Sequence, residues 1–283
     1  MPDIDHIYRW ADTYFNKTGL PIPYRELKII ISEIAGIPKQ KVIAKNNIVI
    51  SESNFRRLKY TIKKRAGGYP LQYLLGHIEF MGIDFFTGRG VFIPRPETEL
   101  VVETAIKFIE QYQYKHVLDL CCGSGVIGLS IALLKQPVNV SLTDISKKAI
   151  ILSKKNCEKL GICSTVTFYR GELFSSLPRD IKFDLIVTNP PYVPHHRIAH
   201  LQKELYYEPL NALDGGSKGM KLINSIIGQA GDFLTERGML VMEHDHTETE
   251  HIKALTRKTK GFKSLKILND LAGFQRVSIL GKS

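Results

Sequence analysis

The apolar residues within positions 1–72 recur at helical spacing, three or four residues apart. This pattern predicts amphipathic helices around residues 4–15, 27–35 and 55–65. Prolines and glycines separate the three stretches, which is typical of connections between helices. Because no catalytic spacing occurs here, we expect residues 1–72 to form a small helical bundle that docks a partner.

Residues 73–97 mix aromatic residues with glycines and lose the helical spacing. This composition predicts a hairpin linker. Near its end, Pro96 suits the first turn of a helix, and the acidic residues that follow suit the positive end of a helix dipole. Arg95 is either a surface charge or a residue that closes over an active site, and the pattern leaves both interpretations open.

From residue 98 to residue 283, short apolar runs alternate with amphipathic segments. The predicted strands are residues 116–120, 138–142, 165–169, 183–188 and 239–243, and the predicted helices are residues 126–134, 147–160 and 220–236. Residues 265–268 and 275–280 predict a closing antiparallel hairpin. Because strands alternate with helices, we expect the α/β class, with a doubly wound and mainly parallel sheet.

One predicted strand, residues 183–188, runs directly into Asn189, Pro190, Pro191 and Tyr192. Neither proline has an N–H group for the sheet, so the strand must end there. In open α/β sheets, ligands bind at the carboxyl ends of the strands. The segment is therefore either a plain turn with a proline stop or, as we favour, part of a binding site.

The chemistry of this segment suits a planar NH2 group. The side-chain oxygen of Asn189 and the carbonyl of Pro190 form two neighbouring acceptors, one for each hydrogen, and Tyr192 offers an aromatic face. We therefore predict Asn189, Pro190 and Tyr192 as catalytic residues that hold an amide or exocyclic amine. The predicted substrate-binding set is Asn189, Pro190, Pro191, Tyr192 and Arg95.

A glycine loop, residues 123–128, matches G-x-G-x-x-G between a predicted strand and helix. Asp144 follows about twenty residues later, where such folds place a carboxylate for ribose hydroxyls. Asp119 precedes the loop; a carboxylate there would repel a pyrophosphate but suits the sulfonium and ammonium groups of S-adenosylmethionine. Asp119 is equally interpreted as a structural acceptor for the turn.

The adenine end of such a cofactor has two candidate contacts after the third strand. Glu172 is placed to reach the adenine amine, and Leu173 to cover the ring. The complete predicted cofactor-binding set is Asp119, Cys121, Cys122, Gly123, Ser124, Gly125, Asp144, Glu172, Leu173 and Asn189.

Composition narrows the class of protein. The 283 residues are 43% hydrophobic and 24% charged, as in soluble globular proteins, and no run of about 18 apolar residues predicts a membrane span. The N-terminus resembles neither a secretory signal nor a transit peptide, so we expect a cytoplasmic protein. The net charge of +11 fits either an acidic or nucleic-acid partner or a generally basic surface.

Neither the cysteines nor the histidines predict a metal site. The four cysteines lack paired C-x-x-C arms, which argues against zinc, and a reducing compartment argues against a disulfide. We interpret the histidines that follow two of the strands as solvent-facing loop residues. These are His195, His196, His200, His244, His246 and His251.

Taken together, these residues resemble the release factor glutamine methyltransferases, the HemK/PrmC family. The resembling stretches are residues 69–76, 93–99, 119–125, 189–192, 207–209, 213–216 and 270–273, with Arg276. The resemblance implies a helical domain joined by a hairpin to a seven-stranded, Rossmann-like methyltransferase domain that uses S-adenosylmethionine. It also implies methylation of the glutamine in the Gly-Gly-Gln motif of class I peptide chain release factors.

Two positions depart from the family pattern, and other functions stay open. Cys121 stands where the family more often has glycine, and Leu173 where some members have an aromatic residue. A methyltransferase for a ribosomal-protein glutamine or for nucleic-acid amines would share the pocket, although no sizeable target-recognition domain is evident. A cofactor-binding scaffold and a nicotinamide dehydrogenase fit less well. We expect a monomer without a membrane partner, and direct nucleic-acid binding is not expected as its main role.

Overall fold

The computed structural model describes residues 1–44 and 48–282. The chain divides into two compact units. One comprises Met1–Gly76 together with Gln202–Tyr207, and the other His77–Leu201 together with Glu208–Ser283.

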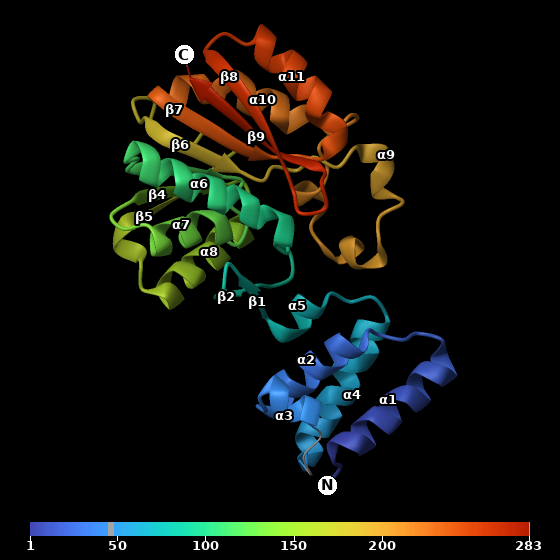
Figure 1. Ribbon diagram of the computed structural model, residues 1–283. Coiled ribbons are helices and arrows are strands. Elements are labelled where there is room, and N and C mark those ends of the chain that lie inside the picture. The colour runs from blue at the N-terminus through green and yellow to red at the C-terminus, as the bar shows by residue number, and fades with distance from the viewer. Residues whose placement is uncertain (45–47, 283) are drawn as a thin grey trace. The chain divides into compact units, whose positions relative to one another are not determined.

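The first unit is helical (Figure 1). Its helices are α1 (Ile4–Thr18), α2 (Tyr24–Ala35), α3 (Lys39–Ala44), α4 (Glu52–Ala66) and α5 (Leu71–Leu75). The three predicted helices are α1, α2 and α4, and their apolar faces share one buried cluster. The short helices α3 and α5 were not predicted, because each is too short to show a helical repeat.

A segment from far along the chain joins this helical unit. It contains the 3₁₀ helix η3 (Lys203–Tyr207). Arg65 Nη2 lies 2.7 Å from Glu204 Oε1, and the rings of Tyr69 and Tyr207 meet at 62° with their centroids 4.8 Å apart.

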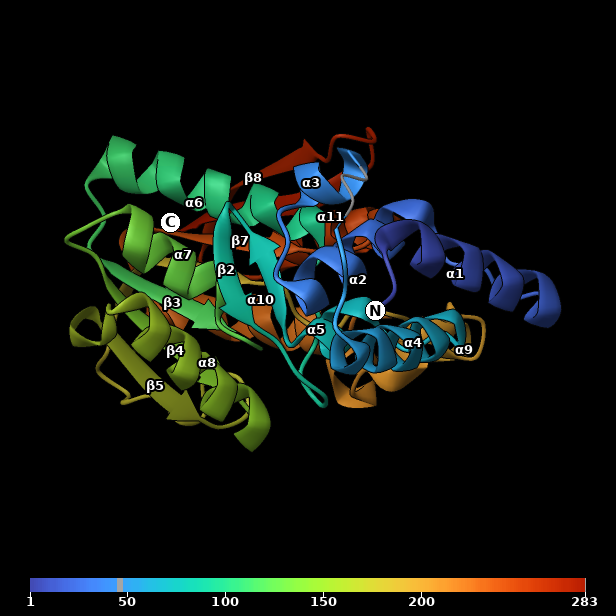
Figure 2. The same cartoon turned by 90° about the horizontal axis from the view of Figure 1, so that it is seen from below.

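The second unit begins with a hairpin of β1 (His77–Phe80) and β2 (Ile83–Phe86), which run antiparallel (Figure 2). Its two turn residues, Met81 and Gly82, both have positive φ, as the tight hairpin turn that follows the strand twist requires. Phe80 and Phe85 lie in the hydrophobic core of the second unit.

The main sheet of the described residues has seven strands in the order β5-β4-β3-β6-β7-β9-β8. The strands are β3 (His116–Leu120), β4 (Asn139–Asp144), β5 (Val166–Arg170), β6 (Phe183–Thr188), β7 (Leu234–Glu243), β8 (Phe262–Asn269) and β9 (Gln275–Lys282). Strands β3 to β7 pair in parallel, and β9 is antiparallel to β7 and β8. The predicted doubly wound sheet with an antiparallel end is confirmed.

Helices cover both faces of this sheet (Figure 1). They are α6 (Glu99–Tyr112), α7 (Val126–Leu134), α8 (Lys147–Leu160), α10 (Lys221–Phe233) and α11 (Thr249–Lys258). The connections between elements carry the short helix α9 (His195–Ile198) and the 3₁₀ turns η1 (Pro96–Thr98), η2 (Cys163–Thr165), η4 (Leu210–Ala212) and η5 (His246–Glu248). Alternate residues of β6 show the two faces. Leu185 and Val187 pack in the cluster of α6, α7 and α8, whereas Ile186 packs in that of α10.

One helix boundary differs clearly from prediction, and one helix was missed. The helix predicted to end near residue 236 ends at Phe233, because Leu234 already pairs with Phe183 in the sheet. Helix α11 was not predicted; its sequence is mostly polar, and only a few of its side chains, such as Ile252, are buried.

Strand β3 lies between β4 and β6. Chain connections leave the sheet on opposite sides at this point, since α7 packs on one face and α10 on the other. The carboxyl ends of β3 and β6 therefore flank the switch point where open α/β sheets bind ligands.

Candidate active site

The glycine loop follows β3 and bends through several left-handed residues. Cys121, Gly123 and Gly125 have φ values of 62°, 57° and 84°. A Cβ at Gly125 would lie 2.9 Å from a methyl of Leu129, so glycine is required there. Cys121 adopts this left-handed backbone although it has a side chain, which costs about 1–2 kcal/mol relative to glycine.

Asp144, at the end of β4, anchors this loop. Its Oδ2 accepts a hydrogen bond of 2.9 Å from Gly123 N, and its Oδ1 accepts one of 2.8 Å from Ser146 N. Burial raises the pKa of Asp144, and the two backbone hydrogen bonds oppose this rise. No atom lies within 4 Å of where a Cβ at Gly123 would stand, so a ligand can approach the backbone closely beside this carboxylate.

One carboxylate oxygen of Asp119 has the structural role considered from the sequence, and the other oxygen has no partner among the described residues. Oδ2 accepts a hydrogen bond of 2.8 Å from Gly128 N. Oδ1 is buried and has no hydrogen-bond partner among residues 1–44 and 48–282. Burial raises the pKa of Asp119 to about 7. The open acceptor, the carboxylate of Asp144 and the bare backbone at Gly123 together fit a cationic, ribose-bearing cofactor.

The remaining predicted cofactor residues line the same loops. Cys122 and Ser124 are buried, and the thiol pKa of Cys122 is raised well above its usual range by burial, so it is not a ready nucleophile. Beyond β5, Glu172 is exposed. Leu173 is buried in the core on one face of the sheet and has a φ of 48°.

Asn189 directly follows β6, and a hydrogen bond holds one end of its side-chain amide. Its Nδ2 donates a hydrogen bond of 3.1 Å to Thr98 Oγ1. Within the described part of the chain, Asn189 Oδ1 has no hydrogen-bond partner. The backbone carbonyls of Asn189 and Pro190 accept no hydrogen bond from a backbone N–H group of the described loops. The acceptor pair predicted from the sequence is therefore open.

The chain beyond the prolines packs tightly against the segment that carries Leu213–Gly216. Val193 N donates to Leu213 O and Gly215 N donates to Val193 O, both at 2.9 Å. A Cβ at Gly215 would lie 2.7 Å from Tyr192 Cα. Glycine at this position thus lets the two backbones meet.

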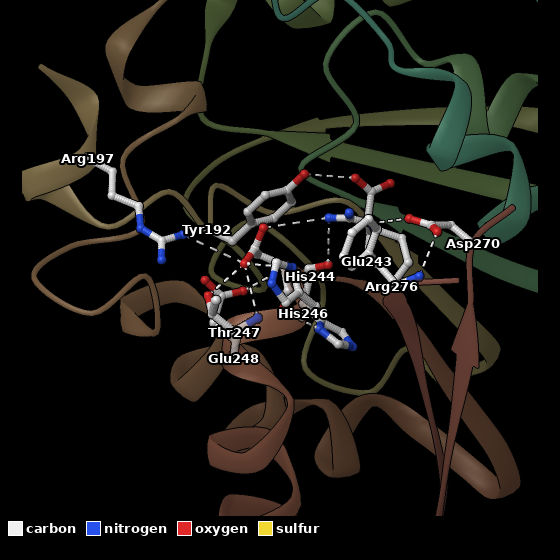
Figure 3. A network of polar contacts seen from close by, with 11 residues as sticks. Tyr192, Arg197, Glu243, His244, His246, Thr247, Glu248, Asp270 and Arg276 are labelled. Carbon is white, nitrogen blue, oxygen red and sulfur yellow. Dashed lines mark hydrogen bonds and ion pairs between the residues drawn. The ribbon is translucent and has the colours of Figure 1, made fainter. Parts of the chain in front are cut away.

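Tyr192 is held through its hydroxyl rather than left loose (Figure 3). The hydroxyl donates a hydrogen bond of 3.0 Å to Glu243 Oε1. Glu243 ends β7 and is only 1% exposed, and burial raises its pKa to about 6. The pKa of Tyr192 is itself raised well above its usual range by burial. Tyr192 is therefore a neutral donor rather than a base.

Behind Glu243 lies a network of polar groups from β7, β9 and η5 (Figure 3). Arg276 Nε donates to Asp270 Oδ2 at 3.1 Å, and Arg276 Nη1 to His244 O at 3.3 Å. The expectation that His244 faces solvent is wrong, because its ring is buried between Asp245 O and Ser278 Oγ, at 2.9 and 2.8 Å. Burial lowers the pKa of His244, so it is neutral.

The other histidines of that prediction lie on the surface. His195, His196, His200, His246 and His251 are exposed. Across residues 1–44 and 48–282, the structure contains no group of three or more histidine, cysteine or acidic side chains that could hold a metal ion.

Arg95 is paired rather than loose. Its guanidinium forms an ion pair with Glu208 Oε1, and Glu208 Oε2 accepts a hydrogen bond of 2.9 Å from Ile93 N. The guanidinium carbon also lies 5.0 Å from the centre of the Phe92 ring. Arg95 thereby ties the stretch before α6 to the long connection after β6, and a direct substrate contact stays a prediction.

Sequence reasoning missed three residues of this site: Thr98, Glu208 and Glu243. Glu243 stands at the carboxyl end of a predicted buried strand, which is a signal for a ligand-side group. Thr98 and Glu208 lie in two stretches that resemble the family, residues 93–99 and 207–209, but neither could be assigned a role from the sequence, because their partners lie 91 and 113 residues away in the chain.

Comparison with known proteins agrees with this geometry. Residues 83–275 match the family model of the Methyltransferase small domain, and residues 6–76 match that of the PrmC N-terminal domain. Among solved structures, the catalytic domain of hMettl16 with a MAT2A 3'UTR hairpin has a TM-score of 0.58 at 14% identity, covering 82% of each chain. A T. thermophilus 16S rRNA methyltransferase in complex with AdoMet and guanosine has a TM-score of 0.53 at 17% identity, covering 73% of this chain and 50% of that one. These likenesses show the fold.

The fold and the loops at its switch point define the chain as an S-adenosylmethionine-dependent methyltransferase. Curated relatives narrow the class. A release factor glutamine methyltransferase of Moorella thermoacetica is 33% identical over 91% of each chain, and one of Thermodesulfovibrio yellowstonii is 35% identical over 92% of each chain. The chain belongs to the release factor glutamine methyltransferase family, which confirms the resemblance seen in the sequence. No helix among the described residues has the length and apolar character needed to cross a membrane.

Proposed function

We propose that this protein transfers a methyl group from S-adenosylmethionine to the side-chain amide nitrogen of the glutamine in the Gly-Gly-Gln motif of bacterial class I release factors. The relatives carry release factor glutamine methylation in their names. The observation that carries the proposal is the open acceptor pair, Asn189 Oδ1 and Pro190 O, at the end of β6 beside the glycine loop. Two acceptors match the two N–H groups of a primary amide.

The cofactor side of the site uses the loop after β3 and the end of β4. When bound, S-adenosylmethionine supplies an electrophilic methyl group on a cationic sulfur. We assign Asp144 to the ribose hydroxyls and the free oxygen of Asp119 to the cationic end. The backbone of residues 121–125 receives the cofactor, and Glu172 and Leu173 flank the adenine.

The substrate side has to make a poor nucleophile react. An amide nitrogen shares its lone pair with the adjacent carbonyl. Asn189 and Pro190, by accepting both N–H groups, orient the nitrogen toward the methyl group, and such positioning is worth up to about 7–11 kcal/mol in well-oriented cases. The nitrogen gains the methyl group as the bond from the methyl carbon to the sulfonium sulfur breaks, which leaves S-adenosylhomocysteine as a neutral thioether. The nitrogen then loses a proton to water, so no strong base is required.

The other predicted substrate residues shape this pocket. Tyr192, with its hydroxyl held by Glu243, presents its ring to the plane of the amide, and Pro191 keeps the segment extended. Arg95 acts through its ion pair with Glu208, which holds the stretch around Ile93 in place. Release factors work in the cytoplasm, so we place the reaction there, with the protein acting as a monomer and without direct nucleic-acid binding.

The test compares Asn189→Ala with Asp144→Ala, using a purified release factor as methyl acceptor. Asn189→Ala should keep S-adenosylhomocysteine affinity within about threefold by calorimetry and lower turnover by about a hundredfold or more. Asp144→Ala should instead weaken cofactor affinity by about tenfold or more, since it loses a hydrogen-bonded carboxylate. Asn224→Ala, on the exposed face of α10, serves as the matched control.

Two outcomes would contradict these assignments. Near-normal turnover of Asn189→Ala would remove the acceptor pair from the reaction. Unchanged cofactor affinity of Asp144→Ala would remove the ribose assignment.

A further inference from the structure

Thr98 is placed where a hydroxyl usually caps a helix, yet it does something else. Thr98 is the N-cap residue of α6, and its side chain makes no capping hydrogen bond. Threonine is one of the residues favoured at N-cap positions. Thr98 is 2% exposed. Its Oγ1 instead accepts the hydrogen bond from Asn189 Nδ2, at 3.1 Å.

The direction of the Asn189 amide decides what the substrate meets. An asparagine amide has an acceptor end and a donor end, and the two are exchanged by a half turn about the last side-chain bond. With Nδ2 on Thr98, Oδ1 is the end left for the substrate. In the reversed orientation, two NH2 groups would face each other and the substrate would lose an acceptor.

The surroundings of Thr98 also direct its own proton. A hydroxyl can donate a hydrogen bond as well as accept one. Thr98 therefore fixes a single orientation of the Asn189 amide only if the hydroxyl proton points away from Asn189. Glu243 Oε2 is buried and has no hydrogen-bond partner among the described residues. Burial raises the pKa of this carboxyl, and the Thr98 hydroxyl opposes that rise. An ionised carboxylate accepts only. It therefore attracts the hydroxyl proton and leaves the oxygen lone pairs for Asn189.

We propose that Thr98 is a positioning residue for methyl transfer: its hydroxyl oxygen holds the Asn189 amide in the orientation that turns Oδ1 toward the substrate. This inference rests on the function proposed above. It adds that the stretch before α6 takes part in turnover through Asn189, without touching the cofactor or the substrate.

The experiment uses the full-length enzyme with Thr98→Val and Thr98→Ser. Valine keeps the shape and removes the hydroxyl, so kcat for methyl transfer should fall by about 10- to 100-fold. The KM for the acceptor should change less than kcat, and S-adenosylhomocysteine affinity should stay within about twofold. Serine keeps the oxygen and should restore kcat to within about threefold of the wild type.

Thr104→Val is the matched control. Thr104 lies on α6 and is also buried, and its hydroxyl donates to Leu100 O rather than to the site. It should leave kcat unchanged. The melting temperature of each variant, measured with bound S-adenosylhomocysteine, identifies any loss that comes from unfolding.

Several results would overturn the inference. These are a wild-type kcat in Thr98→Val, an equal loss in Thr98→Ser and Thr98→Val, or an equal loss in Thr104→Val. Failure of the proposed function looks different, since the wild-type enzyme would then label an acceptor other than the release factor. The same variants compared on that acceptor would still test Thr98.

Discussion

Replacing Glu243 by glutamine should change how the stability of the protein depends on pH. Glu243 is 1% exposed at the end of β7. It has the Tyr192 hydroxyl on Oε1, and Oε2 has no hydrogen-bond partner among the described residues. Burial raises its pKa from 4.5 to about 6. Glutamine has nearly the same shape and no charge to desolvate, so the variant removes the pH-dependent part of the stability that this carboxyl contributes.

The magnitude follows from that rise in pKa. The folded-state value lies above the unfolded one, so the contribution of this carboxyl to stability is complete below pH 4.5 and is lost as the pH rises through 6. At about 1.36 kcal/mol for each pKa unit, the full loss is about 2 kcal/mol. Between pH 5 and pH 7.5 the part that changes is about 1.2 kcal/mol.

The assay is urea unfolding of the wild type and Glu243→Gln at several pH values. The free energy of unfolding of the variant, minus that of the wild type, should rise by about 1.2 kcal/mol from pH 5 to pH 7.5. The offset at any one pH depends on how the new NH2 group is accommodated, so the slope is the quantity to test. Thr104→Val changes no titratable group, so the difference between its free energy of unfolding and that of the wild type should not vary with pH. A flat difference for Glu243→Gln as well, or a falling one, would refute the burial argument.

The remaining predictions concern backbone strain and the Tyr192 hydroxyl. Gly125→Ala should lower the free energy of unfolding by about 2–4 kcal/mol, because of left-handed backbone strain and overpacking. Gly228→Ala, on an open helix face, should instead raise the free energy of unfolding by about 0.5–1 kcal/mol. Urea titrations followed by circular dichroism would show whether the two changes have opposite signs. Cys121→Gly should be more stable than Cys121→Ala by about 1 kcal/mol, and the reverse order would contradict the strain at φ 62°. Tyr192→Phe should cost about 1.5–3 kcal/mol, the worth of a hydrogen bond to a charged group, and should raise the pKa of Glu243 further; an unchanged pH profile would count against the hydrogen bond.

Most of the sheet was predictable from the sequence because its strands are local. Strand β6 was predicted at Phe183–Thr188, where the structure has it, since a buried parallel strand is a continuous apolar run that two prolines end. The glycine loop and Asp144 were predictable because about twenty residues separate them in a recurring unit. Helix α11 was missed because its buried face is narrow.

The residues that hold the site residues in place could not be predicted from local sequence patterns. Thr98 meets Asn189 and Tyr192 meets Glu243 across 91 and 51 residues, and no local pattern states which strand ends lie together. His244 was misplaced for the same reason. A histidine after a strand is usually in a loop, and only the antiparallel strand β9, which brings Ser278 beside it, buries this one.

Methyl transfer from labelled S-adenosylmethionine to a purified release factor tests the central claim most directly. The parallel reactions contain the same factor with the glutamine of its Gly-Gly-Gln motif replaced, a ribosomal protein fraction, RNA and DNA. We expect label on the intact factor and none on the factor without that glutamine. Label on the ribosomal proteins or on nucleic acid, with none on the release factor, would contradict it.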